Sequence, residues 1–152
     1  MKFESKLLLA NFAATWFLVG LIWMVQVIHY PLFDDVGQQN YVQYQQRHQS
    51  NITLIVGPLM LLELVTAVLM IKHSPDGACP TSVYAGAGLV VLIWLSTGLI
   101  QVPCHNALSQ GFDPSTHLWL VNSNWIRTIA WTLRGFLTAW MISQQLVFVE
   151  AD

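Results

Sequence analysis

The chain has 152 residues, of which 55% are hydrophobic and only 9% are charged, and its formal net charge is −2. Soluble globular proteins carry about 25% charged residues, so this composition excludes an ordinary soluble domain and indicates a protein that folds in lipid. The basic residues form no patch that could displace counterions from phosphates, which excludes a nucleic-acid partner. Membrane spans leave no length for a separate soluble core, so residues 1–152 are predicted to form one domain.

The first predicted span covers residues 7–29. No Asp, Glu, Lys or Arg occurs between Leu7 and Phe33, and a helix of about 20 apolar residues suffices to cross a bilayer. This stretch is longer than the apolar region of a signal peptide, and no cleavage motif follows it. The pattern therefore predicts an uncleaved membrane anchor.

The second span is predicted over residues 52–72 and contains Pro58 and Glu63. Residues 37–51 precede it, are rich in Gln and place aromatic residues at helical spacing, which predicts a polar helical lead-in. A proline inside a membrane helix is tolerated where neighbouring helices satisfy the carbonyl group that it frees. The third span is predicted over residues 83–103, inside a long stretch without charged residues.

The fourth span is predicted over residues 124–148. The Asn and Ser residues at 122–124 can either cap a helix or break one, so the start of this helix is placed between Ser115 and residue 124. Glu150 and Asp152 are left as a short polar end.

Four spans joined by short turns predict an all-α membrane protein, a four-transmembrane-helix antiparallel bundle. In that topology Lys2, Lys6 and Lys72 fall on one side of the membrane, and only Arg47 falls in the loops of the other. Cytoplasmic loops carry an excess of Lys and Arg, so both termini are predicted to be cytoplasmic, in a bacterial inner membrane. This orientation places four histidines at the outer end of the bundle: His29, His48, His105 and His117.

Polar residues at helical spacing form one stripe on each of three predicted helices, which predicts a polar interior in the outer half of the bundle. Such residues often hold membrane helices together through interhelical hydrogen bonds, and this packing role is the alternative to a functional one. The stripes comprise Asn11, Thr15, Gln26 and His29; Trp94, Thr97, Gln101 and His105; and Asn124, Arg127, Trp131, Arg134 and Thr138.

Three charged residues inside the spans are candidate catalytic residues: Glu63, Arg127 and Arg134. An ionised side chain at the bilayer centre costs roughly 2.5–3.5 kcal/mol on insertion scales, so it is usually paired or functional. Glu63 and Arg134 reach a similar depth on helices that run in the same direction, and we predict that they pair. The alternative is an ion pair that only fixes helix register. Arg127 lies about two turns further out and can bind an anionic substrate or a lipid head group, or else anchor its helix at the interface.

His29, His48 and His105 come from three segments and are predicted to meet at the outer mouth of the bundle. Imidazole binds iron, copper and zinc, so these histidines are candidate metal ligands, and iron, copper or haem is the expected cofactor. The alternative is that each is an ordinary hydrogen-bonding residue at the interface. The chain lacks the paired Glu-x-x-His motif that marks carboxylate-bridged di-iron bundles.

Over nearly its whole length the chain resembles a family of small bacterial four-span membrane proteins without assigned function. The resemblance rests on four strings: Trp23–Phe33, Gly57–Leu64, Gln101–His105 and Asn124–Thr128. The span layout and two short strings, Val102–Pro103 and Asn124–Arg127, are more faintly similar to the anthrone-oxygenase-like membrane proteins. That second resemblance implies oxygenation of an aromatic ring with little cofactor, with His105 and Arg127 as the residues that carry over. His29, His48 and Glu63 have no match in its pattern.

Together these features predict a membrane-embedded oxidoreductase, or a metal- or haem-binding protein, that acts on a lipophilic small molecule near the outer face. The three histidines would serve as ligands or acid–base groups, and the three charged residues would tune charge and position the substrate. The alternative is a non-catalytic bundle, either an assembly subunit or a carrier of small solutes or protons, in which the polar stripes are packing contacts or a proton path. Membrane lipid is the expected surrounding partner in both cases.

Overall fold

The computed structural model describes residues 2–151, with side chains through residue 147. Asp152 and the side chain of Glu150, the predicted polar end, lie outside the described residues. The described chain is helical apart from short turns, and its elements follow in this order: α1 (Phe3–Met24), the π-helical η1 (Val25–His29), the 3₁₀ turn η2 (Pro31–Phe33), α2 (Gln38–Lys72), α3 (Pro80–Ser96), the π-helical η3 (Thr97–Gln101), α4 (Val102–Leu108) and α5 (Pro114–Ala151).

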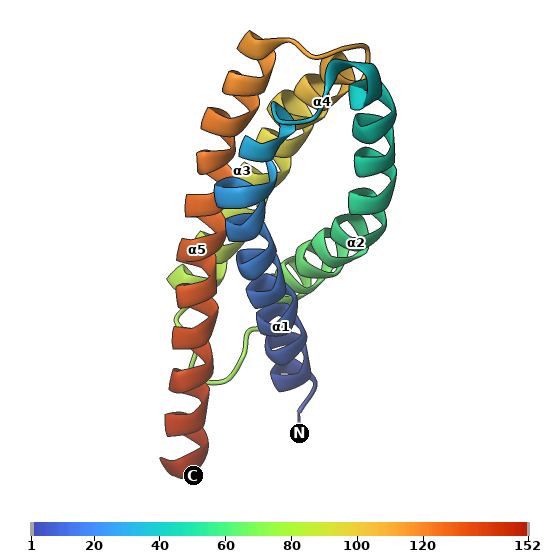
Figure 1. The fold of residues 1–152 in the computed structure, drawn as a ribbon. Coiled ribbons are helices and arrows are strands. Elements are labelled where there is room, and N and C mark those ends of the chain that lie inside the picture. Colours follow the sequence, from blue (N-terminus) through green and yellow to red (C-terminus); the bar gives the residue numbers. More distant parts are fainter. Residues whose placement is uncertain (1, 152) are drawn as a thin grey trace.

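These elements build four helical rods that run alternately up and down and pack side by side (Figure 1). α1 continues into η1, and α3 continues through η3 into α4. The N- and C-termini lie at the same end of the molecule (Figure 1). We call the opposite end, where η1, α4 and the start of α2 meet, the far end.

Three of the rods are long and apolar enough to cross a membrane: Phe3–His29, Gln38–Lys72 and Pro80–Leu108. The fourth rod, α5, carries Arg127 and Arg134 and is not among them within the described chain. Large apolar side chains such as Leu54, Leu99 and Phe136 face outward, and extensive exposed apolar surface is unusual for a soluble monomer. The chain is thus consistent with an integral membrane protein.

The helices are longer than the spans predicted from hydropathy. α2 runs without interruption from Gln38 to Lys72, so the predicted polar lead-in and the second span form one helix. The lead-in keeps helical geometry because its buried face, which includes Tyr41 and Gln45, packs into the bundle.

α5 begins at Pro114, one residue before the interval from Ser115 to residue 124 in which the start of the fourth helix was predicted. Asp113 caps it: the carboxylate accepts hydrogen bonds from the backbone N–H of Thr116 at 2.7 Å and from the hydroxyl of Ser115 at 2.6 Å. These hydrogen bonds lower the pKa of the Asp113 carboxyl to about 2. A proline is favoured at the first helical position, since the N–H it lacks would have no partner there. The Asn124 amide does not cap the helix, and it donates across the bundle to Gln26.

Prolines shape the helices around the far half of the bundle. α2 is visibly bent (Figure 1), and Pro58 lies inside it; proline removes a helical hydrogen bond and clashes with the carbonyl four residues earlier. Pro31 and Pro103 follow η1 and η3 after one intervening residue, so the carbonyls that they leave without a partner, four residues earlier, lie within these wider π turns. The bend and the two π turns all border the cavity described below.

Candidate functional site

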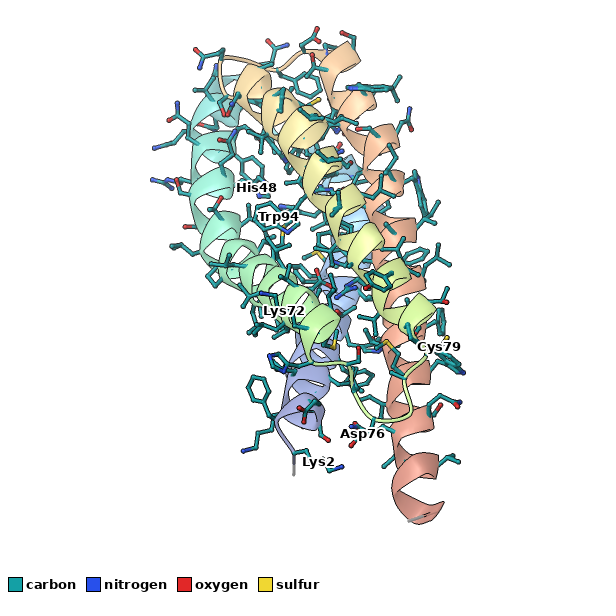
Figure 2. All side chains as sticks on the ribbon, turned by 180° about the vertical axis from the view of Figure 1, so that it is seen from behind. Lys2, His48, Lys72, Asp76, Cys79 and Trp94 are labelled. Carbon is teal, nitrogen blue, oxygen red and sulfur yellow. The ribbon has the colours of Figure 1, made fainter. Side chains whose placement is uncertain are left out.

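A cavity of about 350 Å³ lies between α1, α2, the α3–η3 helix and α5 in the far half of the bundle. Most of its wall is apolar and includes Leu18, Ile22, Val56, Met60, Trp94 and Trp131. The α2 part of the wall runs from Gln49 to Met60, which is the bent stretch around Pro58. Figure 2 shows Trp94 in the half of the bundle that also holds His48, away from Lys72 and Asp76. The bend thus holds α2 away from the other helices where the cavity lies.

Among the polar residues that line the cavity, Tyr30, His105 and Arg127 are joined by hydrogen bonds, and we call this group the polar end. The Tyr30 hydroxyl lies 2.8 Å from Nε2 of His105, and Nη2 of Arg127 donates to the same hydroxyl at 3.2 Å. Nδ1 of His105 lies 2.7 Å from Nε2 of Gln45. The polar end is therefore a continuous chain of hydrogen bonds that reaches the cavity wall.

The donor and the acceptor of each of these hydrogen bonds follow from the groups present. The Gln45 amide nitrogen donates, so Nδ1 of a neutral His105 accepts and its proton sits on Nε2. Nε2 then donates to the Tyr30 oxygen, which also accepts from Arg127. With two hydrogen bonds accepted, the Tyr30 hydroxyl keeps its own proton to donate to a group in the cavity.

Other side chains hold the polar end in place. The buried His117 ring binds the backbone carbonyl of Tyr30 through Nε2 at 2.8 Å. The Gln49 amide donates to the backbone carbonyl of His105 at 2.6 Å. Asn124 accepts hydrogen bonds from Nε and Nη2 of Arg127 and itself donates to Gln26 on η1. The functional side chains are thus fixed from helices on several sides of the cavity.

His29 and His48 lie behind the polar end and do not line the cavity. Nε2 of His29 is 2.9 Å from Nδ1 of His48, and the His48 ring centre is 5.4 Å from that of His105. Phe33 is fully buried against the His29 and His48 rings. The structure therefore brings the three predicted metal ligands side by side. Within residues 2–147, however, no group of three His, Cys, Asp or Glu side chains is arranged to hold a metal ion. The metal site stays a prediction.

Three buried polar atoms on one face of α2, all beside this histidine group, have no hydrogen-bond partner in the structure. They are the Tyr41 hydroxyl, Oε1 of Gln45 and Nε2 of His48. A buried polar atom without a partner is costly, and in native proteins such atoms often mark a bound water or ion.

A second polar network lies deeper in the bundle and contains the predicted ion pair. Nε of Arg134 is 2.8 Å from Oε1 of Glu63, and both side chains are at most 1% exposed. Thr15 also donates to Oε1 of Glu63, and the Trp131 indole donates to Oε2 at 3.1 Å. The remaining Arg134 nitrogens donate to the Gly86 carbonyl and to Asn11. The predicted pairing of Glu63 with Arg134 is confirmed, and the network contains residues of all four rods.

This network touches the cavity only through Trp131, which lines the cavity wall and binds Glu63. Neither Glu63 nor Arg134 lines the cavity, and their part in chemistry remains a prediction. Arg127, by contrast, lies at the polar end with His105, as its spacing on the fourth helix predicted.

Tyr30 and Gln45 take part in the site but were not among the site residues predicted from the sequence. Tyr30 joins His105 to Arg127, and Gln45 sets the His105 tautomer. The available signal for Tyr30 was its place between His29 and Pro31 at the end of a span, where a proline disturbs the helix. Gln45 could not be singled out, since it is one of several glutamines in residues 37–51.

Comparison with known proteins gives no match: no family model, no curated protein and no solved structure is similar to this chain.

Proposed function

We propose that the protein is a four-span membrane protein that binds a lipophilic small molecule in its cavity and exchanges a proton with the polar group of that molecule. The supporting observation is the division of the cavity into a long apolar wall and one polar end. Small-molecule sites are typically apolar pockets with a few polar groups that fix orientation. Here those groups are a phenol, an imidazole and a guanidinium in one hydrogen-bonded chain.

The chemistry follows from the direction of that chain. The Tyr30 proton is the one left to donate to an oxygen of the bound molecule, and hydrogen bonds from Nε2 of His105 and from Arg127 stabilise the phenolate that remains until the proton returns to it. Such a transfer is general acid–base catalysis, and it needs donor and acceptor within hydrogen-bond reach. Oxidation or reduction of a lipophilic substrate, the reaction class predicted from the sequence, is one that requires proton transfer of this kind.

The binding part is tested by looking for a molecule that co-purifies. We expect mass spectrometry of organic extracts from detergent-purified protein to find a lipophilic molecule in stoichiometric amount. Gly57→Leu should lose it, because Gly57 lines the cavity and a Cβ atom there meets only Thr53 Cγ2, at 3.9 Å. Leucine would therefore fill the cavity without disturbing the backbone.

Gly88→Leu is the matched control, since Gly88 is also inside a helix, does not line the cavity and has open space at its Cβ position. Retention in Gly88→Leu with loss in Gly57→Leu supports the cavity as the binding site. Equal amounts in both variants, or no such molecule in wild type, would overturn the proposal in favour of a non-catalytic bundle.

The proton-transfer part is tested with the recovered molecule in heavy water. Infrared difference spectra against pH should show that wild type changes the pH at which the polar group of the bound molecule ionises, and that His105→Gln binds the molecule without this change. The same ionisation behaviour in His105→Gln would rule out a part for the histidine in the proton transfer.

A metal- or haem-dependent oxidoreductase is the second candidate, favoured by the unpartnered Nε2 of His48 beside the His29 and His105 rings. Metal analysis and a visible spectrum of wild type, His29→Ala and His48→Ala decide it. Stoichiometric iron, copper or haem that is lost in both variants supports this candidate, whereas no metal in any sample rejects it.

A further inference from the structure

Two arginines are buried in the bundle, and they differ in how their charge is balanced. Arg134 is 1% exposed and pairs with the Glu63 carboxylate. Arg127 is 6% exposed, and no carboxylate lies within ion-pair distance of it among the described side chains. Its hydrogen-bond acceptors are Asn124, Tyr30 and Thr97, all of which are neutral.

A buried cation without a counter-ion is expensive. Burying an ionised group costs several kcal/mol unless it is paired, and hydrogen bonds to neutral groups offset only part of this. Lysine or histidine could lose the proton, but an arginine side chain stays charged in proteins. The Arg127 site therefore has a net positive charge that the rest of the described chain does not neutralise.

The unbalanced charge faces the cavity. Arg127 lines it, and its Nη1 atom makes only one long hydrogen bond, at 3.4 Å to Thr97. Its Nε and Nη2 atoms are held by Asn124 and Tyr30. Nη1 is thus the least satisfied part of a guanidinium whose orientation is fixed from the other side.

Building on the proposed lipophilic-ligand site, we infer that the natural occupant is an anionic amphiphile whose carboxylate or phenolate oxygen binds Arg127 and whose single chain or ring lies along the apolar wall. One guanidinium balances one negative charge, which favours a monoanionic head. A cavity of about 350 Å³ lies near the low end of the range for small-molecule sites and suits one chain or ring system rather than a two-chain phospholipid. The Tyr30 hydroxyl supplies a second donor to the same oxygen.

The test uses a fluorescent fatty acid, cis-parinaric acid, and its uncharged methyl ester, with protein in maltoside detergent. Trp94 and Trp131 line the cavity, so energy transfer from tryptophan reports binding there. Wild type should bind the acid about tenfold to a hundredfold more tightly than the ester, the range expected of a hydrogen bond to a charged group. Arg127→Gln should lose this preference, and Arg127→Lys should keep part of it.

A second probe, an alkylated nitrophenol, distinguishes a phenolate head group from a carboxylate. A 4-nitrophenol with an alkyl substituent next to its hydroxyl group is strongly yellow only when ionised, so its absorbance shows directly whether the site holds the anion. Tighter binding of the yellow form than of the fatty acid assigns a phenolate occupant, and the reverse assigns a carboxylate.

The stability of the ligand-free variants provides a second, independent readout. Removing an uncompensated buried charge should leave the melting temperature of Arg127→Gln equal to or above that of wild type, whereas Arg134→Gln should melt at a lower temperature. The anion inference is overturned, with the cavity proposal intact, if acid and ester bind wild type equally and Gly57→Leu abolishes both. If wild type binds neither probe, the proposed lipophilic site itself fails.

Discussion

At the scale of single residues, both oxygens of the buried Glu63 carboxylate have hydrogen-bond donors. Its two oxygens accept hydrogen bonds from Thr15, Trp131 and Arg134. These partners stand on α1 and α5, and Arg134 also reaches α3 through the Gly86 carbonyl. A Cβ atom at Gly86 would lie 3.0 Å from Nη1 of Arg134, so glycine is what lets the guanidinium approach this helix. The network therefore joins all four rods, and we predict that it fixes their relative register.

Removing one partner of this pair should destabilise the protein strongly. We expect Glu63→Ala to lower the free energy of unfolding by about 3–5 kcal/mol, since the buried Arg134 charge loses its counter-ion. Reversible unfolding in mixed detergent micelles measures this change.

The double variant Glu63→Gln/Arg134→Met is the control, because it removes both charges and leaves none uncompensated. It should recover much of the stability lost in Glu63→Ala. A single variant as stable as wild type would show that the pair does not hold the helices in register.

At the scale of elements, three prolines lie where the helices deviate from straight α-helices beside the cavity. A straight α2 would follow its neighbours along its whole length, whereas the bend near Pro58 leaves space that the cavity occupies. The π turns before Pro31 and Pro103 adjoin the segments that carry Tyr30 and His105. An extra residue per turn rotates the side chains that follow, which is one reason why π turns are frequent at functional sites.

Straightening α2 should close the cavity. Pro58→Ala restores an N–H donor and removes the ring clash, so we expect a higher melting temperature together with weaker binding of the fatty-acid probe. Pro80→Ala is the matched control, because Pro80 lies in the first turn of α3, where proline costs little. Unchanged probe binding in Pro58→Ala would show that the bend does not maintain the cavity.

At the scale of the whole molecule, Lys2 and Lys72 lie at the end opposite to the polar end of the cavity. Lys2 binds Asp76 of the α2–α3 turn at 2.8 Å, close to the N-terminus, and Lys72 ends α2 in the same part of the molecule (Figure 2). From the positive-inside rule we predict that this end faces the cytoplasm and that the polar end of the cavity lies toward the outer face. A lipophilic substrate would then reach the polar end from the outer leaflet.

Cys79 offers a direct test of this orientation. It is exposed in the α2–α3 turn, and hydrogen bonds from Thr81 lower the pKa of its thiol, so more of it is thiolate at neutral pH. A membrane-impermeant maleimide should label it in inside-out vesicles and not in intact spheroplasts. Cys79→Ser is the control. Its remaining cysteine, Cys104, is buried, so the Cys79→Ser variant should stay unlabelled. Labelling in spheroplasts would invert the topology and place the cavity's polar end near the cytoplasm.

The sequence alone determined the features that depend on spacing along one helix. Hydropathy located the helices, and an acidic and a basic residue at matching depths predicted the Glu63–Arg134 pair, because an unpaired charge in lipid is too costly. The helix ends were harder to predict, because a hydropathy pattern marks only where the apolar residues end. The start of α5 is set instead by the Asp113 cap. The fourth predicted span lies in α5, which carries two buried arginines and is not among the described helices that are long and apolar enough to cross a membrane.

Only the tertiary structure decided which polar residues meet. Tyr30, Gln45 and Arg127 come from three segments, and packing of these segments brings Tyr30 and Gln45 to His105 and Arg127 to Tyr30. The prolines mark where the helices deviate, but the sequence does not say which side chains the deviations bring together. The same holds for the imbalance between the two arginines. Both are buried arginines on one helix, but packing brings a carboxylate to Arg134 and leaves Arg127 facing the cavity with neutral neighbours, because charge compensation is a property of three-dimensional contact and not of sequence position.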